Sequence, residues 1–261
     1  MDKMFNFSKI GEKIAVIDKS LKYKRKNKVY INNGKDTPDE QFIKQFDNIA
    51  IDDGEFMLSP DKDTERITMY VCGSAGSGKS YFVAQYVQEY HKTFKNNMIY
   101  LISENDEDPA FDKLDYVKRI VIEDLHENPI DWREFNECLV IFDDIDSIKG
   151  KLGKTIDELR DKLLKNSRKF KVSVISTSHD ACNGRETKSV LNESKIIVFF
   201  MLNYNRSLKY LLENYLGLGK TAIQKLRQHS SKSRWTAYVK GYPSYLIQQK
   251  LITTINKFEE Q

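Results

Sequence analysis

The sequence lacks the features of a membrane-spanning or disulfide-bonded protein. No stretch approaches the ~18 consecutive apolar residues that a transmembrane helix needs. The first residues, Met1-Asp-Lys-Met-Phe-Asn, do not show the order of charged and then apolar residues that a signal peptide has. The three cysteines, Cys72, Cys138 and Cys182, match no metal-binding spacing. We therefore expect a protein that neither spans a membrane nor is exported, with cysteines that serve as buried apolar residues in a reducing compartment.

A strong charge of one sign is also absent. The net charge of +4 is too small to indicate nucleic-acid binding by itself. With 40% apolar and 31% charged residues, the 261-residue chain is of ordinary globular composition and long enough for one large core. It contains no repeat of fixed period and no low-complexity tract. One main domain is therefore the simplest expectation.

The most informative segment is Gly73-Ser-Ala-Gly-Ser-Gly78-Lys79-Ser80, which fits the pattern G-x-x-x-x-G-K-[ST] at every fixed position. It follows the apolar run 67–72 and precedes a predicted helix at 81–91, which is the context that a phosphate-binding loop requires. Its glycines let successive N–H groups face a β-phosphate, and the helix N-terminus adds its positive dipole end. Lys79 is expected to contact the β- and γ-phosphate oxygens, and Ser80 to hold Mg²⁺. The segment predicts binding of ATP and Mg²⁺ by Gly73, Ser74, Ala75, Gly76, Ser77, Gly78, Lys79, Ser80 and Tyr81.

A second apolar run, Cys138-Leu-Val-Ile-Phe142, ends in the carboxylates Asp143 and Asp144. A buried parallel strand of this kind delivers its acids to the carboxyl edge of the sheet, where ligands bind in open α/β folds. Asp143 is then expected to hold Mg²⁺, and Asp144 to polarise the attacking water. A strand that runs into a solvated turn would give the same pattern, but the upstream phosphate-binding loop favours the catalytic interpretation.

The order of the segments predicts an α/β fold. Apolar strand-like segments lie at 67–72, 98–102, 119–122, 138–142, 172–177 and 196–201, and helices are predicted at 81–91 and 155–169. This alternation predicts a P-loop NTPase of the ASCE or RecA-like kind, with a mostly parallel sheet and helices on both faces. In the helix at 155–169, the apolar positions Ile156, Leu159, Leu163 and Leu164 are expected to face the core. Its other face carries Arg160, Lys162, Lys165 and Arg168.

Both ends of the chain carry additional material. Candidate strands at 13–17 and 28–32, the basic cluster 22–28 and the turn residues 32–34 predict an N-terminal β-hairpin extension over residues 1–60. Residues 61–261 are then the P-loop ATPase domain with a C-terminal β/α elaboration.

The segment 172–177 is followed by polar residues that suit a sensor. If this strand lies between the P-loop strand and the Asp143 strand, its end meets the γ-phosphate. Thr177, Ser178 and His179 are then placed to sense that phosphate. Ser178 is equally well explained as a residue that satisfies a strand end, whereas His179 is favoured as part of the catalytic site.

These motifs together resemble a known family. The Gly-Ser-Gly-Lys-Ser loop, Val-Ile-Phe-Asp-Asp-Ile-Asp, Ser-Val-Ile-Ser-Thr-Ser-His, residues 191–194, Ser233-Arg-Trp235 and Tyr242-Pro243 look like the poxvirus-type DNA-packaging ATPases. Large nucleocytoplasmic DNA viruses and their virophages encode these proteins, which form a branch of the FtsK–HerA superfamily. The resemblance spans about residues 65–248. It implies a ring-forming, Mg-ATP-driven motor that moves double-stranded DNA into a capsid.

The chain departs from this pattern at two positions. Bacterial FtsK-like motors place a Glu after the Walker B Asp, where this chain has the shorter Asp144. Those motors also end the sensor strand in Gln, where this chain has Ser178 followed by His179. The first departure concerns the catalytic base and the second concerns the sensor.

The resemblance also implies residues that act between subunits or on DNA. Ring ATPases usually complete each site with an arginine from the neighbouring subunit, and Arg168 is the first candidate here, with Arg185 second. Lys149, Lys151 and Lys154 with two glycines suit a flexible, sequence-independent phosphate contact, but an ordinary solvated loop has the same composition.

Two other classes of function stay open. A nucleotide or small-molecule kinase would use an arginine-rich lid, for which Arg227 and Arg234 give little support, and a GTPase would need an absent Asn-Lys-x-Asp motif. An ATP-gated assembly protein would not need the intact Lys79, Ser80, Asp143 and Asp144. The resemblance implies double-stranded DNA, further copies of the chain and a capsid or portal protein as partners. It implies the host cytoplasm, in a viral factory, or the virion as location.

Overall fold

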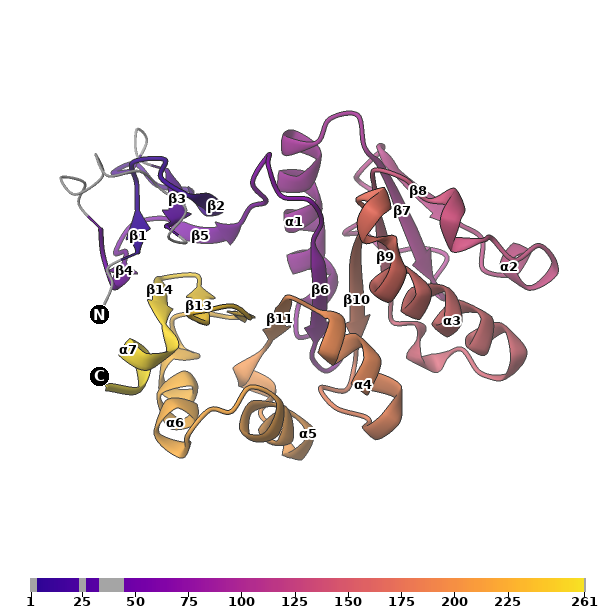
Figure 1. The fold of residues 1–261 in the computed structure, drawn as a ribbon. Coiled ribbons are helices and arrows are strands. Elements are labelled where there is room, and N and C mark those ends of the chain that lie inside the picture. Colours follow the sequence, from indigo (N-terminus) through magenta and orange to yellow (C-terminus); the bar gives the residue numbers. More distant parts are fainter. Residues whose placement is uncertain (1–3, 24–26, 33–44, 261) are drawn as a thin grey trace.

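The computed structural model describes residues 4–23, 27–32 and 45–260. A ten-stranded sheet in the order β4-β14-β13-β12-β11-β6-β10-β9-β7-β8 forms the centre of the molecule (Figure 1). Neighbouring strands from β11 to β8 are parallel. This parallel part comprises β6 (Thr68–Cys72), β7 (Met98–Ser103), β8 (Val117–Ile120), β9 (Cys138–Asp143), β10 (Ser173–Ser178) and β11 (Ile196–Phe199). The predicted α/β fold with a mostly parallel sheet is confirmed.

The remaining strands pair antiparallel. They extend the large sheet on the far side of β11 and are β12 (Thr236–Val239), β13 (Tyr245–Gln248), β14 (Leu251–Thr254) and β4 (Asn48–Ala50). A separate four-stranded antiparallel sheet, ordered β1-β3-β2-β5, lies beside them (Figure 1). Its strands are β1 (Phe5–Asn6), β2 (Glu12–Asp18), β3 (Lys28–Ile31) and β5 (Glu55–Leu58). The division near residue 60 stays a prediction, and the predicted turn at 32–34 falls largely outside the described residues.

Helices follow most of the parallel strands. They are α1 (Lys79–Thr93), α2 (Asp124–Glu127), α3 (Gly150–Asn166), α4 (Gly184–Glu193), α5 (Arg206–Tyr210), α6 (Lys220–His229) and α7 (Ile255–Glu260). Short 3₁₀ turns lie at η2 (Trp132–Glu134), η3 (Ile145–Ser147), η4 (Ser167–Phe170) and η5 (Met201–Asn203), and a π-helical turn at η6 (Leu211–Tyr215). No helix of the described ranges is both long and apolar enough to cross a bilayer.

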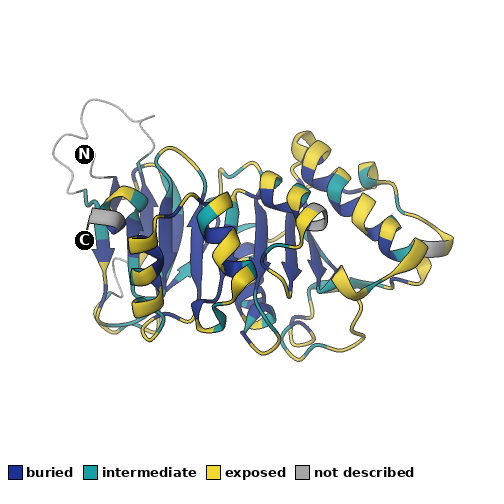
Figure 2. Ribbon diagram, turned by 90° about the horizontal axis from the view of Figure 1, so that it is seen from below, coloured by how far each residue is buried: buried dark blue, intermediate teal, exposed yellow. Residues whose placement is uncertain are grey.

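The sheet is buried on both faces, which explains its unbroken apolar strands. In β6, Met69 and Val71 face one hydrophobic cluster, and Tyr70 and Cys72 face the other. The first cluster joins the sheet to α1 and the N-terminal sheet, and the second joins it to α3, α4, α5, α6 and α7. Figure 2 shows the buried strands behind helices whose outer stripes are exposed. The predicted helices on both faces are confirmed.

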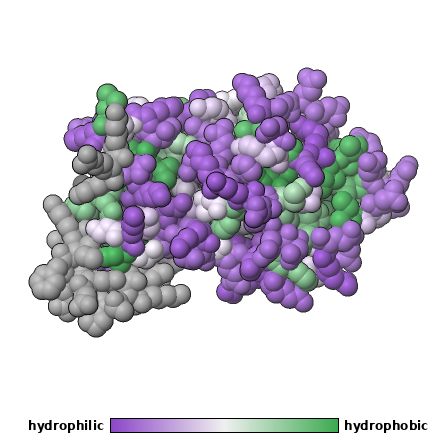
Figure 3. Space-filling model, turned by 90° about the horizontal axis from the view of Figure 1, so that it is seen from above, coloured by the Kyte–Doolittle hydropathy of each residue, from purple (hydrophilic) through white to green (hydrophobic). Residues whose placement is uncertain are grey.

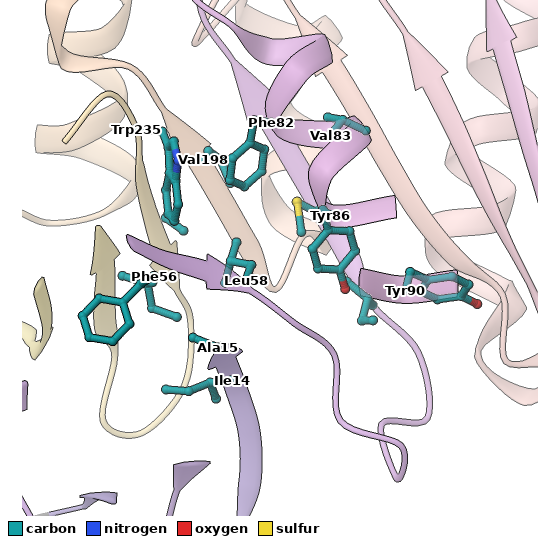
Figure 4. Packing of buried hydrophobic residues seen from close by; sticks show 14 of the residues in the cluster. Ile14, Ala15, Phe56, Leu58, Phe82, Val83, Tyr86, Tyr90, Val198 and Trp235 are labelled. Carbon is teal, nitrogen blue, oxygen red and sulfur yellow. The ribbon is translucent and has the colours of Figure 1, made fainter. Parts of the chain in front are cut away.

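The P-loop helix is fixed by aromatic packing on the first of these faces. Phe82 of α1 contacts Trp235 edge-to-face, with 4.9 Å between ring centroids (Figure 4). Leu58 and Phe56 of β5 and Ala15 of β2 belong to the same cluster (Figure 4). The N-terminal sheet and the C-terminal strands therefore share one core with the helix that follows the phosphate-binding loop.

The structure corrects three details of the sequence prediction. Helix α3 begins at Gly150 rather than at 155, so Lys151 and Lys154 lie in a helix and not in a flexible loop. Arg160 was expected on the solvated face but is buried, because its guanidinium pairs with Asp157 at 2.9 Å and its stem packs inside. Strand β8 begins at Val117, two residues before its predicted start. Ile156, Leu159, Leu163 and Leu164 are buried as predicted.

Exposed apolar side chains are scattered over the part of the surface that the structure describes. The face shown in Figure 3 is mostly hydrophilic, with apolar side chains between the charged ones. Among the described residues, the large apolar side chains that are exposed belong to separate elements, such as Leu202 on η5 and Tyr210 on α5. Cys72 and Cys138 are buried free thiols, and burial raises the pKa of both, so neither ionises readily at neutral pH.

Candidate active site

The loop from Gly73 to Gly78 connects the carboxyl end of β6 to α1. Gly78 has φ +106° and ψ 23° at the start of the helix, a conformation that L side chains rarely adopt. At Gly73 a Cβ atom would lie 2.8 Å from Ser77 Oγ, so a side chain would collide with the loop itself. The Gly73 N–H donates to Ser178 O at 3.0 Å and ties the loop to β10. The glycines of the motif thus serve the close turn that was predicted for them.

Lys79 lies at the centre of the site and is only 5% exposed. Its Nζ donates to Gly73 O at 3.0 Å and lies 3.4 Å from Asp144 Oδ1. His179 Nδ1 lies 3.3 Å from the same nitrogen. The lysine is therefore held by an acid, an imidazole and the loop that precedes it.

Strand β10 lies between β6 and β9, as the sequence predicted, and brings Thr177 between the two acids. Thr177 Oγ1 donates to Asp143 Oδ1 at 2.9 Å and also lies 3.1 Å from Asp144 Oδ1. The Asp144 N–H donates to the same hydroxyl at 2.9 Å, because Asp144 adopts a left-handed conformation with φ 48°. This turn at the end of β9 directs Asp144 toward Lys79 and leaves Asp143 facing inward.

Asp143 is 1% exposed. Burial raises its pKa to about 6, and the neighbouring charge of Asp144 adds to the rise. The Thr177 hydrogen bond and the charge of Lys79 lower the pKa only in part. A buried carboxylate without a cation of its own is electrostatically costly, and a divalent cation would remove that cost.

The two polar residues after Thr177 point to different places. His179 Nε2 lies 3.2 Å from Asp144 Oδ2, so His179 joins the site together with Asp144 and Lys79. The Ser178 hydroxyl instead donates to Asp146 and accepts from the Asp180 N–H at 3.2 Å. Ser178 is therefore directed away from Lys79, whereas Thr177, which the sequence did not single out from its neighbours, contacts both acids.

The loop suits a phosphate ligand by its chemistry. Ser77 Oγ is buried and has no hydrogen-bond partner among the described residues, so a polar group inside the loop would satisfy it. Ser80 follows Lys79 in the first turn of α1, and Asp143 supplies an oxygen ligand of the type that Mg²⁺ prefers. Tyr81 is 58% exposed, and its hydroxyl accepts from Gln85 Nε2 at 3.3 Å. Tyr81, the last of the nine predicted residues, thus contacts solvent and its own helix rather than the loop.

Arg168, the first candidate for the arginine that acts between subunits, lies apart from this site. Arg168 precedes β10 and is therefore at the amino edge of the sheet, opposite the loop, where its Nε donates to Glu65 at 2.9 Å. Its side chain is 74% exposed. Arg185 lies on the first turn of α4, which follows the carboxyl end of β10. Arg168 is thus on the side of the sheet away from Lys79 of its own chain.

Arg234, which the sequence did not place in this site, contacts the loop. Arg234 precedes β12, and its Nε donates to Ser77 O at 3.0 Å. The segment Ser233-Arg-Trp235 was noted as part of a family resemblance, and Arg234 also as weak support for the arginine-rich lid of a kinase. No local pattern marks such a contact, because the two residues are far apart in the sequence and meet only through the pairing of β12 with β11.

Comparison with known proteins identifies the family of the chain. The AAA domain family matches residues 65–207. The uncharacterised protein V3 of the Sputnik virophage is 31% identical over 238 residues, which cover 90% of this chain and 92% of that protein. These two matches confirm the resemblance to virus-encoded P-loop ATPases that the motifs indicated.

Solved structures are similar at lower identity. The cytoplasmic domain of the type VII secretion ATPase EccC from Thermomonospora curvata aligns with a TM-score of 0.50 and 12% identity, covering 80% of this chain and 28% of that chain. This similarity shows the fold. The genome packaging NTPase B204 from Sulfolobus turreted icosahedral virus 2, in complex with ATP-gammaS, aligns with a TM-score of 0.45 and 15% identity, covering 74% of this chain and 99% of that chain.

The raised pKa of Asp143 predicts how stability depends on pH in magnesium-free, nucleotide-free protein. The folded state favours the neutral carboxyl of Asp143. Its contribution to the free energy of unfolding is therefore complete below about pH 4 and is lost as the pH rises through about 6. At 1.36 kcal/mol per pKa unit the loss is about 3 kcal/mol. Urea unfolding between pH 4 and pH 8 in EDTA should show this loss of unfolding free energy in the wild type and not in Asp143→Asn.

The control for this measurement is Asp63→Asn, which removes an exposed carboxylate. Its free energy of unfolding should follow the wild-type curve with pH. Parallel curves for the wild type and Asp143→Asn would contradict the assignment.

Proposed function

The chain belongs to the AAA domain family, and from this premise we propose that it is an Mg-ATP-hydrolysing motor that moves double-stranded DNA into a viral capsid. The observation that carries the ATPase part is found at one edge of the sheet, where Thr177 contacts both Asp143 and Asp144 and Lys79 pairs with Asp144. A lysine on a glycine loop next to two acids is the set of groups that phosphoryl transfer from a Mg-nucleotide requires.

Lys79 changes partner during binding in this proposal. Its ammonium pairs with Asp144 and contacts His179. Phosphate oxygens that enter the loop would attract the ammonium, and Asp144 would then be free to act as a base. Binding of the phosphates and release of the base are therefore coupled in this proposal.

Asp143 and Ser80 would hold Mg²⁺, which would neutralise charge on the phosphate oxygens. Asp143 must lose its proton to serve as a ligand, and its pKa of about 6 leaves it mostly ionised at neutral pH. Thr177 has one hydroxyl proton for two nearby carboxylates, so it can donate to either Asp143 or Asp144. Its hydroxyl therefore connects the carboxylate that would hold the metal to the proposed base.

Asp144 and His179 position the attacking water. Asp144 is 16% exposed on its side chain, and His179 lies against its second oxygen at 3.2 Å. Asp144 is one methylene shorter than the Glu of bacterial FtsK-like motors, and the adjacent imidazole gives the site a second polar group that faces the same space. General-base assistance of this kind is worth about 10²- to 10⁴-fold in rate.

The DNA part of the proposal is supported by the motif resemblance and by a physical connection from the site to the predicted lysines. Ser178, next to Thr177, donates to Asp146 on η3. Lys149 Nζ donates to Asp146 O at 2.8 Å, and α3 with Lys151 and Lys154 starts at the next residue. Movement at the end of β10 would therefore be transmitted to the lysine segment. Lysines on a helix N-terminus suit phosphate contacts without reading bases.

The assembly part of the proposal is a ring of identical subunits. Arg168 lies at the edge of the sheet opposite its own loop, so it can complete an active site only in a neighbouring subunit. A capsid or portal protein as further partner, and the host cytoplasm in a viral factory or the virion as location, follow from the same resemblance. The B204 protein is a genome packaging NTPase, and we propose genome packaging for this chain as well.

The first prediction of this proposal concerns the phosphate site. Lys79→Ala should abolish ATP binding and turnover, because the charge that meets the phosphates is lost. Asp144→Asn should bind ATP within about threefold of the wild type and lose about 10²-fold or more in kcat. Lys92→Ala, on the exposed end of the same helix, is the control and should keep both. If Asp144→Asn hydrolyses ATP at the wild-type rate, the base is another residue.

The second prediction concerns DNA. Duplex DNA should stimulate ATP turnover independently of base sequence and less at higher salt. Replacing Lys149, Lys151 and Lys154 by Ala should reduce the slope of log affinity against log salt by up to about 2.7. The matched control is the triple Ala variant of three other exposed lysines: Lys162 and Lys165 near the other end of α3, and Lys169 on the following turn η4. Turnover that ignores DNA but rises with a small phosphate acceptor would instead indicate a kinase.

The third prediction concerns the ring. Arg168→Ala should bind ATP and assemble but hydrolyse slowly, because only charge stabilisation in the transition state is lost. Mixing Arg168→Ala with Lys79→Ala subunits should restore turnover above that of either variant, since some interfaces then pair an intact loop with an intact arginine. Mixed rings verified by mass but without recovery would exclude Arg168 and leave Arg185 for the same test.

A further inference from the structure

Arg234 contacts the phosphate-binding loop from outside the site. Its Nε donates to Ser77 O at 3.0 Å and its terminal NH₂ group donates to Gly76 O at 3.4 Å. The guanidinium packs against Gly78, where a Cβ atom would lie 3.3 Å from Nε. Three successive residues of the loop are thus in contact with one side chain that comes from a distant part of the chain.

These contacts act on the backbone groups that shape the loop. In a phosphate-binding loop the N–H groups turn toward the ligand, so the carbonyls at Gly76 and Ser77 turn outward. A planar guanidinium can hold two outward carbonyls at once, which a lysine ammonium cannot do with the same geometry. Donation to a carbonyl also polarises the peptide group and strengthens the N–H on its other side as a donor.

Arg234 is itself held from both sides. Its backbone N–H donates to Gln249 Oε1 at 2.6 Å, and Gln249 Nε2 donates to Glu55 of β5 at 3.0 Å. The next residue, Trp235, is buried against Phe82 of α1 (Figure 4). The backbone of Arg234 is therefore held in place by Gln249 and Trp235. Through Gln249, the N-terminal sheet is connected to the arginine that contacts the loop.

We propose that Arg234 is a positioning residue that holds the phosphate-binding loop in its ligand-binding shape, and that Gln249 fixes Arg234 to the N-terminal sheet. This inference rests on the proposed function, because it concerns the same nucleotide site. The loop meets the β-phosphate, which ATP and ADP share, so Arg234 supports the binding of both nucleotides. It contacts carbonyls rather than the reacting phosphate, so its role lies in binding and not in the chemical step.

The test measures nucleotide affinity and turnover separately. Arg234→Ala should weaken ATP and ADP binding by the same factor of about ten, equivalent to about 1.4 kcal/mol, and keep kcat at saturating ATP within about twofold. Arg234→Lys should recover part of the affinity, to about threefold below the wild type, because it keeps the charge but not the fork. Binding is followed with a fluorescent ATP analogue and by competition with ADP.

A double-mutant cycle tests the anchor. Gln249→Ala should weaken binding about threefold, and adding it to Arg234→Ala should have no further effect, because both act through one contact. Lys232→Ala, an exposed cation two residues before Arg234, is the matched control and should bind like the wild type. Thermal unfolding without nucleotide identifies any variant that is misfolded, and Arg234→Lys and Gln249→Ala then carry the test.

The outcomes separate this inference from the proposed function. If the wild-type protein binds ATP, and Arg234→Ala binds ATP and ADP as tightly as the wild type does, the inference alone is overturned. A loss of kcat with unchanged affinity, or a loss confined to ATP, would make Arg234 a catalytic or γ-phosphate-sensing group and would equally overturn it. Wild-type protein that binds no ATP would overturn both.

Discussion

The pairing of β10 with β6 on one side and β9 on the other is the constraint on which the site depends. Parallel strands end at one edge, so this order brings the phosphate-binding loop, Thr177 and the two acids within hydrogen-bonding distance. If β9 paired directly with β6, Thr177 would not stand between Asp143 and Asp144. The continuous apolar strands permit this arrangement because helices and a second sheet cover both faces and leave only the strand ends polar.

The same arrangement places like charges close together at the strand ends. Two acids and a lysine share a region where Asp143 is almost completely buried, and the lysine pairs with Asp144 rather than with Asp143. Burial raises the pKa of Asp143 to about 6, which shows that the folded chain alone does not compensate its charge. In the proposed function a cation at Asp143 and a phosphate at Lys79 would compensate these charges, and the donors and acceptors for both already lie at the strand ends.

The two edges of the sheet have different chemistry. The carboxyl edge holds Lys79, Asp143 and Asp144, and the amino edge holds the exposed Arg168 beside Glu65. In the proposed ring Arg168 would act on a neighbouring subunit, whereas Arg234 contacts the loop of its own chain. The N-terminal sheet is joined to this loop through Gln249, so material outside the P-loop core can influence how firmly the loop is held.

The sequence by itself determined the loop, the acids and the succession of parallel strands along the chain. Each of these depends on neighbouring residues: the loop on glycines beside Lys79, and the strands on unbroken apolar runs. It also indicated that β10 belongs between β6 and β9. Only the tertiary structure decided that Thr177 rather than Ser178 contacts the acids, that Arg160 is buried, and that Arg234 lies on the loop. These outcomes depend on the direction of side chains and on the pairing of distant strands. No short sequence pattern encodes such contacts, because they arise only when separate elements pack together.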